Sequence, residues 1–232
     1  MPLVPGDPRI DDTTRYGAIA FSDASANRQR ASGSINWYGR HMAEGRDIGE
    51  PQELDGPTAQ LIRSTDSFFL ATVAPSGWPY IQHRGGPPGF VHVPDPSTIE
   101  LGDYSGNQQF VTLGNLDRDN RIALFFIDYP TRTRVKVFGR AEIIERAADP
   151  EFIDRMLTTE HGMIRTRCDR GFRIHVEALD RNCIKNIPVK YGSERMAESL
   201  HLARAPLLDE IEQLRRRNQE LEDEIARLRG QR

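Results

Sequence analysis

The chain has 232 residues, of which 38% are hydrophobic and 28% are charged, and its net charge is −3. This length predicts one globular domain, alone or with an appendage. Because the net charge is negative, we exclude the class of nucleic-acid-binding proteins whose surface is basic as a whole. A membrane-spanning helix needs a run of about 18 apolar residues, and the sequence contains none. We also see no secretory signal at the N-terminus.

The first 50 residues show no sustained hydrophobic period and are rich in Gly, Ser, Asp and Arg. We therefore expect residues 1–50 to form an extended or partly helical arm that packs on another part of the molecule. Residues 51–64 permit a helix with an apolar face, although Gly56 and Pro57 interrupt it.

The pattern then changes to short β-prone runs. We expect strands at residues 68–73, 79–84, 90–93, 98–101, 121–128, 134–144 and 172–179, with short helices at 107–115 and 150–158. Ser76-Gly77, between the first two runs, is a hairpin signal. Six or seven closely spaced strands with a few short helices predict a mainly β (α+β) fold, a β-barrel with helical additions, over residues 51–200.

The last segment, residues 205–232, carries a heptad repeat. Its seam residues recur in steps of four and three: Leu207, Ile211, Leu214, Asn218, Leu221, Ile225 and Leu228. Isoleucine at the a positions and leucine at the d positions favour a parallel two-stranded coiled coil, in which a single asparagine at an a position fixes register and strand number.

Charges beside the seam agree with a parallel homodimer. The crossed pairs between positions g and e are all opposite in sign: Glu210 with Arg215, Arg217 with Glu222, and Glu224 with Arg229. The alternative is a surface helix on its own domain, for which the asparagine and the three pairs would be coincidental. The residues before the seam are not a basic cluster, which excludes a basic-region zipper that binds DNA.

Several kinds of chemistry leave no trace in the sequence. The histidines lack metal-ligand spacing, so we expect no metal, and there is no phosphate-binding glycine loop or nucleophile elbow. Two cysteines, Cys168 and Cys183, are too few for a disulfide framework and fit a reducing cytoplasm.

Two stretches are rich in hydrogen-bond donors. One carries Gln82, His83 and Arg84 before Gly85, and the other, Ser105-Gly106-Asn107-Gln108, opens the expected helix at 107–115, where backbone N–H groups suit an anion. A third strand adds Arg132, Arg134 and Lys136. Together they predict a cationic site for a phosphate and a polar ring; the alternative is solvated strand ends and a turn.

The blocks GWPYIQHRGG, GNQQ and DYPTRTRVKVFGRA, within residues 66–190, resemble the pyridoxamine 5′-phosphate oxidase-like family of FMN-binding split barrels. The resemblance implies a six-stranded split β-barrel and a homodimer with two FMN sites at the subunit interface.

By this resemblance the cofactor-binding residues are Gln82, His83, Arg84, Gly85, Ser105, Gly106, Asn107, Gln108, Arg134 and Asn182. Relatives usually carry a basic residue at the position of Gln108. The Arg-x-His pair that holds substrate in true pyridoxamine phosphate oxidases is missing from residues 181–195.

The leading hypothesis is an FMN-dependent oxidoreductase that acts on a small organic substrate or a reduced nicotinamide, and not on pyridoxamine phosphate. No side chain is identified as its catalytic acid or base. A second hypothesis is a non-enzymatic flavin- or haem-binding sensor or carrier dimer. A third is an assembly module that has lost its cofactor. The sequence does not distinguish FMN from a deazaflavin.

Overall fold

The chain divides into two compact units, Met1–Ile187 and Pro188–Arg232. The computed structural model describes residues 15–38, 49–182, 186–191, 204, 207–208, 210–222 and 227. No helix in these ranges combines the length and the apolar character needed to cross a membrane.

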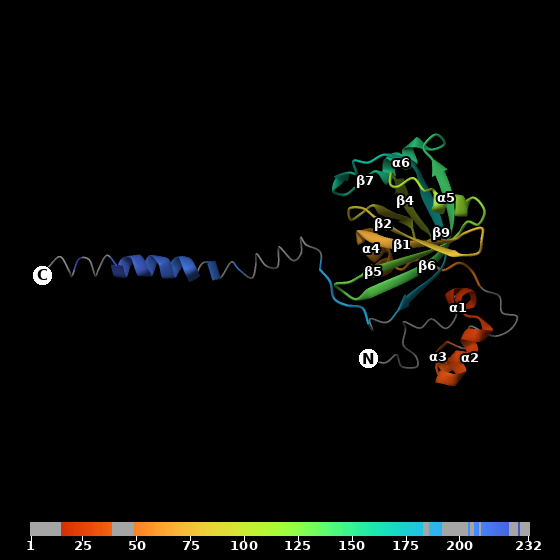
Figure 1. Cartoon of the computed structure of the whole chain (residues 1–232), viewed down its shortest axis with the longest axis horizontal. Coiled ribbons are helices and arrows are strands. Elements are labelled where there is room, and N and C mark those ends of the chain that lie inside the picture. The colour runs from red at the N-terminus through yellow and green to blue at the C-terminus, as the bar shows by residue number, and fades with distance from the viewer. Residues whose placement is uncertain are drawn as a thin grey trace. The chain divides into compact units, whose positions relative to one another are not determined.

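One antiparallel sheet forms the body of the larger unit (Figure 1). Its strands lie in the order β2 (Pro79–Gly85), β1 (Ser67–Val73), β5 (Arg121–Asp128), β6 (Thr133–Glu145), β9 (Cys168–Asn182), β4 (Thr98–Tyr104) and β3 (Val91–Asp95). All seven runs that were expected to be strands are strands of this one sheet, which confirms the α+β class. The sheet has one strand more than the six implied by the resemblance.

The sheet curls around the main hydrophobic core, and a smaller cluster lies around the helix at Pro150–Met156. Alternate side chains of its strands point to one side and are almost fully buried, among them Phe68, Leu101, Leu124, Val137 and Ile174. Strands β2 and β3, which are fully described, form the two edges of the sheet. They do not pair with each other, so the sheet does not close into a complete barrel. The fold is therefore a barrel that is open along this side.

Three short helices accompany the sheet: α4 (Gly56–Ser64), α5 (Val111–Leu116) and α6 (Pro150–Met156). Gly56 and Pro57 do not interrupt α4 but begin it, because Asp55 caps the helix by accepting a hydrogen bond from the Thr58 N–H, and proline suits a first turn. A small hairpin of β7 (Thr158–Thr159) and β8 (Gly162–Met163) follows α6.

The helix expected at 107–115 begins later than the sequence pattern indicated. Gln108 and Phe110 have φ angles of 57° and 54°, a left-handed conformation that cannot belong to a right-handed helix. Residues 105–110 therefore form a loop, and α5 begins only at Val111.

The described part of the arm is helical, in α1 (Arg15–Ala20), α2 (Asp23–Ser32) and α3 (Ile35–Tyr38). Helix α1 packs on the sheet: the Tyr16 ring stacks on Phe138 at 5.0 Å between centroids, and Arg15 forms an ion pair with Glu177 of β9. The rest of the expected arm, residues 1–14 and 39–48, lies outside the described residues.

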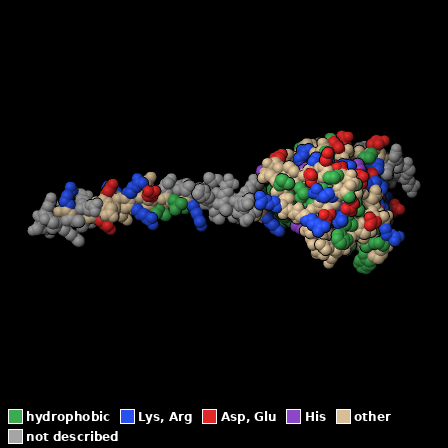
Figure 2. All heavy atoms as spheres, turned by 90° about the horizontal axis from the view of Figure 1, so that it is seen from above, with side chains coloured by type: hydrophobic (Ala, Val, Ile, Leu, Met, Phe, Trp, Pro, Cys, Tyr) green, Lys and Arg blue, Asp and Glu red, His purple; other side chains and the backbone are tan. Residues whose placement is uncertain are grey.

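The described part of the smaller unit is helical at residues 207–208 and 210–222, where every residue is exposed. Figure 2 shows basic and acidic side chains interspersed along this segment and over the visible face of the larger unit. Two of the predicted coiled-coil positions, Ile225 and Leu228, lie outside the described residues.

Candidate functional site

A cavity of about 370 Å³ lies on the open side of the barrel. Four parts of the chain line it: strand β2, the end of β4 with the loop that follows, the first turn of α5, and the start of β9. The lining residues are Tyr80, Gln82, Arg84, Asp103, Tyr104, residues 105–113, Arg167, Asp169 and Arg170. The volume is that of a small-molecule site.

Strand β2 contributes polar side chains because it is an edge strand. Its residues Gln82 and Arg84 pair in register with Leu70 and Phe68 of β1, so they point to the same side of the sheet as those core residues. Within the described ranges no strand pairs with the outer edge of β2, and the Gln82 and Arg84 side chains line the cavity.

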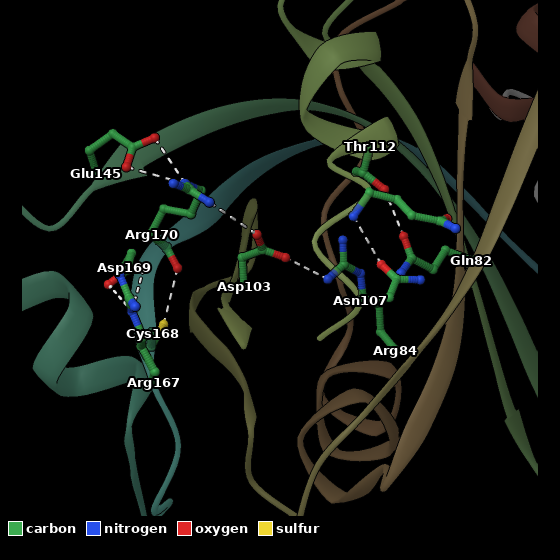
Figure 3. Close-up of polar contacts among 11 residues, drawn as sticks. Gln82, Arg84, Asp103, Asn107, Thr112, Glu145, Arg167, Cys168, Asp169 and Arg170 are labelled. Carbon is green, nitrogen blue, oxygen red and sulfur yellow. Dashed lines mark hydrogen bonds and ion pairs between the residues drawn. The ribbon is translucent and has the colours of Figure 1, made fainter. Parts of the chain in front are cut away.

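A chain of charged side chains crosses the cavity wall (Figure 3). Glu145 accepts a hydrogen bond from Arg170 at 3.0 Å, Arg170 lies 3.9 Å from Asp103, and Asp103 pairs with Arg84 at 2.6 Å. The Arg84 and Asp103 side chains are each only 14% exposed. The Arg84 Nε atom is buried and has no hydrogen-bond partner among the described residues.

The loop over residues 105–110 forms the next wall. The Asn107 side chain accepts a hydrogen bond from the Gln109 N–H at 3.1 Å, which tightens the turn between the left-handed residues Gln108 and Phe110. Because no helix begins here, the expectation that a helix N-terminus supplies the anion site at residue 107 is wrong. Any anion bound here would meet the polar side chains and backbone of a loop.

Side-chain hydrogen bonds fasten helix α5 to the edge strand β2 and to its neighbour β1. Thr112 and Tyr80 donate to Gln82 Oε1 at 3.1 and 3.3 Å, and the buried Asn115 donates to Thr72 at 2.8 Å. These contacts use the amide oxygen of Gln82. Its amide nitrogen is therefore the part of this side chain that suits a ligand acceptor.

Tyr104 in the cavity wall is not a ready acid or base. Burial, with a smaller contribution from Cys168, raises the pKa of Tyr104, and its hydroxyl donates to the Met156 carbonyl at 2.8 Å. Burial likewise raises the pKa of the Cys168 thiol. Both groups therefore stay protonated at neutral pH.

The structure brings six of the ten expected site residues together around the cavity: Gln82, Arg84, Ser105, Gly106, Asn107 and Gln108. His83 lies on the opposite face of β2, where its ring meets Phe69 at 5.8 Å between centroids. Gly85 ends β2 and pairs with Ser67, outside the lining.

The other two expected residues, Arg134 of β6 and Asn182 of β9, are register partners in the sheet. Arg134 does not line the cavity. The Arg134 Nε atom is buried without a partner in the described part of the chain. Lys136, expected on the same cationic strand, contacts Tyr16 and Asp180.

The cavity also contains residues that the sequence did not indicate, above all Arg167, Asp169 and Arg170. They reach it because β4 pairs with β9 and places Tyr104 opposite Cys168. Nothing local in the sequence marks them, since their position depends on a pairing between strands more than 60 residues apart in the chain. Among the described residues, no cluster of three or more His, Cys, Asp or Glu side chains is arranged to hold a metal.

A model of the pyridoxamine 5′-phosphate oxidase family matches residues 54–170, half of the chain. This stretch contains β1 to β6 and every cavity residue described above. The chain belongs to the pyridoxamine 5′-phosphate oxidase family. No curated protein sequence matches the chain.

Solved structures similar to this family member include HupZ of Group A Streptococcus, with 19% identity over 60% of this chain and 99% of the other, at a TM-score of 0.44. An FMN-binding protein of Syntrophomonas wolfei has 10% identity over 54% and 82%, at a TM-score of 0.41. An F420 reductase has 20% identity over 54% and 97%, at a TM-score of 0.39. Identities and scores this low do not extend what the family model shows.

Proposed function

We propose that this protein is an FMN-dependent oxidoreductase that acts on a small organic substrate or a reduced nicotinamide, and not on pyridoxamine phosphate. The observation that carries the proposal is the donor-rich cavity, whose wall holds the Arg84 guanidinium paired with Asp103 at 2.6 Å. Membership of the pyridoxamine 5′-phosphate oxidase family supplies the link to flavin.

The residues present fit a flavin mononucleotide. The cavity volume of about 370 Å³ lies in the range of small-molecule sites. Ser105, Asn107 and Gln108 offer neutral donors for a phosphate, and Arg84 offers a charged one. Gln82 would donate its amide to the polar edge of the ring or to the ribityl chain. When bound, the flavin supplies hydride transfer, and the protein supplies binding, orientation and exclusion of water.

A homodimer would bring Arg134 and Asn182 to the flavin. Arg134 lies outside the cavity of its own chain, and the family resemblance implies a site at the interface of two subunits. The outward face of β1 and β2 is a suitable interface, because Phe69, Val73 and Ile81 are 37%, 41% and 65% exposed there. On this proposal Arg134 of one chain contacts the flavin held by the other.

A non-enzymatic flavin- or haem-binding carrier is the second candidate. One observation favours it: the Tyr104 hydroxyl is hydrogen-bonded to a carbonyl, and its raised pKa keeps it protonated. Such a carrier needs the cavity but no acid or base within it.

The visible absorption spectrum of the purified protein, taken again after addition of FMN and desalting, separates these functions. Flavin bands at about 450 nm that persist after desalting support the cofactor. Steady oxidation of a reduced nicotinamide then supports the oxidoreductase over the carrier. A Soret band instead of flavin bands would support haem, and a protein that stays colourless after FMN addition would overturn the proposal.

A further inference from the structure

An exposed apolar seam runs along the C-terminal helix. Leu207, Ile211, Leu214 and Leu221 are 58%, 45%, 59% and 41% exposed. They stand at spacings of four, three and seven residues, which places them on one side of a helix. Such a row of large apolar side chains in water indicates a surface that another molecule covers.

The side of this helix away from the seam carries an ion pair of its own. Arg216, at an f position, donates to Glu212 at 2.8 Å, one turn away. Arg217, beside the seam, pairs with Glu220 at 3.2 Å in the single chain. Pairs of this kind are typical of the solvent side of a helix. The polar sides therefore suit water, and the seam is the side that requires a partner.

We propose that the partner is the same helix of a second copy of this chain, bound in parallel and in register as a two-stranded coiled coil. Ile211 would pack on Ile211 of the partner subunit, and Leu214 and Leu221 on their own equivalents. Isoleucine at the a position with leucine at d is the combination that favours two parallel strands.

The charges beside the seam match a second copy. In the parallel register Glu210 faces Arg215 of the partner subunit, and Arg217 faces Glu222 of the partner subunit. All four of these residues are exposed in the single chain. Because each contact occurs twice by symmetry, the helix is complementary to itself, which a surface for an unrelated protein need not be.

Asn218 distinguishes the parallel pair from an antiparallel one. An antiparallel alignment also matches charges, because Arg215 then faces Glu222 and Arg217 faces Glu224. That alignment buries the Asn218 amide against Leu221, where it finds no hydrogen-bond partner. In the parallel register Asn218 meets Asn218 of the partner subunit, and the two amides hydrogen-bond across the seam.

The proposal stands apart from the flavin function, since none of its residues lines the cavity. The test is disulfide cross-linking of the full-length protein. In the variant Ile211→Cys, only a parallel, in-register pair brings the two introduced thiols together, because an antiparallel pair separates them by several turns. Gln213→Cys is the matched control, as residue 213 is exposed on the same helix but at a c position, away from the seam.

Mild oxidation should convert most Ile211→Cys chains to a covalent dimer. The fraction of covalent dimer should be at least fivefold lower for Gln213→Cys and for the unmodified protein. Mass mapping should identify the bond as one between two copies of residue 211, which excludes a bond to a native cysteine. Adding Leu214→Glu should abolish the cross-link. Equal cross-linking of the two cysteine variants, or none at residue 211, would overturn the proposal. Neither result would depend on whether FMN binds.

Discussion

Arg84 and Asp103 form an ion pair of 2.6 Å that joins β2 to β4 across the open side of the barrel, where no backbone ladder connects the two strands. The pair also lies in the cavity wall, so Arg84 holds the edge of the barrel and faces the ligand site at once. A bound phosphate would share Arg84 with the Asp103 carboxylate. Arg84 is therefore the residue whose loss should affect binding most.

Replacing Arg84 by alanine should weaken FMN binding roughly 10- to 100-fold. A hydrogen bond to a charged group contributes about 1.5–3 kcal/mol, and each 1.4 kcal/mol corresponds to about tenfold in affinity. Quenching of flavin fluorescence measures the dissociation constant. Arg118→Ala is the matched control, because it removes the same charge from an exposed residue that does not line the cavity. An unchanged affinity in Arg84→Ala would remove this residue from the site.

Introducing a cation at residue 108 should strengthen FMN binding. In the cavity wall Arg84 and Arg170 both face the carboxylate of Asp103, so little positive charge is left uncompensated for a phosphate dianion. Gln108→Lys adds one charge there, and we expect about tenfold tighter binding that weakens as salt is added.

The control for residue 108 is Gln213→Lys, which changes the net charge equally on the exposed C-terminal helix. If both lysine variants alter FMN affinity to the same extent, the gain comes from net charge alone and the phosphate does not lie at residue 108.

The strands were predictable because their residues alternate between core and exterior, as Val135 and Val137 do in β6 between the outward Arg134 and Lys136. The start of α5 was not predictable from the sequence. The left-handed backbone at Gln108 and Phe110 occurs at residues other than glycine, so no residue type indicates it. The presence of Arg167, Asp169 and Arg170 in the cavity wall was not predictable either. It depends on a register between distant strands, which no local pattern encodes.

A methyl group at residue 139 should destabilise the larger unit. A Cβ atom on Gly139 would lie 2.7 Å from both the His175 carbonyl oxygen and the Ile174 side chain, beside a register shift between β6 and β9. Overpacking of this kind typically costs about 1–3 kcal/mol, so Gly139→Ala should lower the urea midpoint.

Gly114→Ala provides the opposite case, because a Cβ atom at residue 114 in α5 meets nothing within 4 Å. It should leave stability unchanged or raise it by up to about 1 kcal/mol. Equal midpoints for the two alanine variants would show that β6 can move away from β9 at this point.

The docking of α1 should depend on pH through Glu177. Burial raises the pKa of Glu177, but hydrogen bonds from Arg15 and Arg140 outweigh burial and bring the pKa below its ordinary value of 4.5. A carboxyl group with a lowered pKa in the folded state stabilises that state above pH 4.5, and this contribution is lost as the pH falls through the folded-state pKa.

Glu177→Gln should therefore unfold at lower urea than the unmodified protein at pH 7, and the difference should shrink below pH 4.5. Glu160→Gln, an equal charge change at an exposed residue, controls for net charge. A difference that is constant from pH 7 to pH 3 would mean that the charge of Glu177 does not hold α1.

Asn218 should set the number of chains in the coiled coil. A buried asparagine at an a position lowers stability but disfavours every assembly in which it finds no equivalent amide. Asn218→Ile removes this restriction, so the helix should melt at a higher temperature while sedimentation shows species larger than a dimer. Gln213→Ile, on the outer side of the same helix, should change neither quantity. A variant Asn218→Ile that sediments only as a dimer would show that the contact between barrels, and not Asn218, determines how many chains assemble.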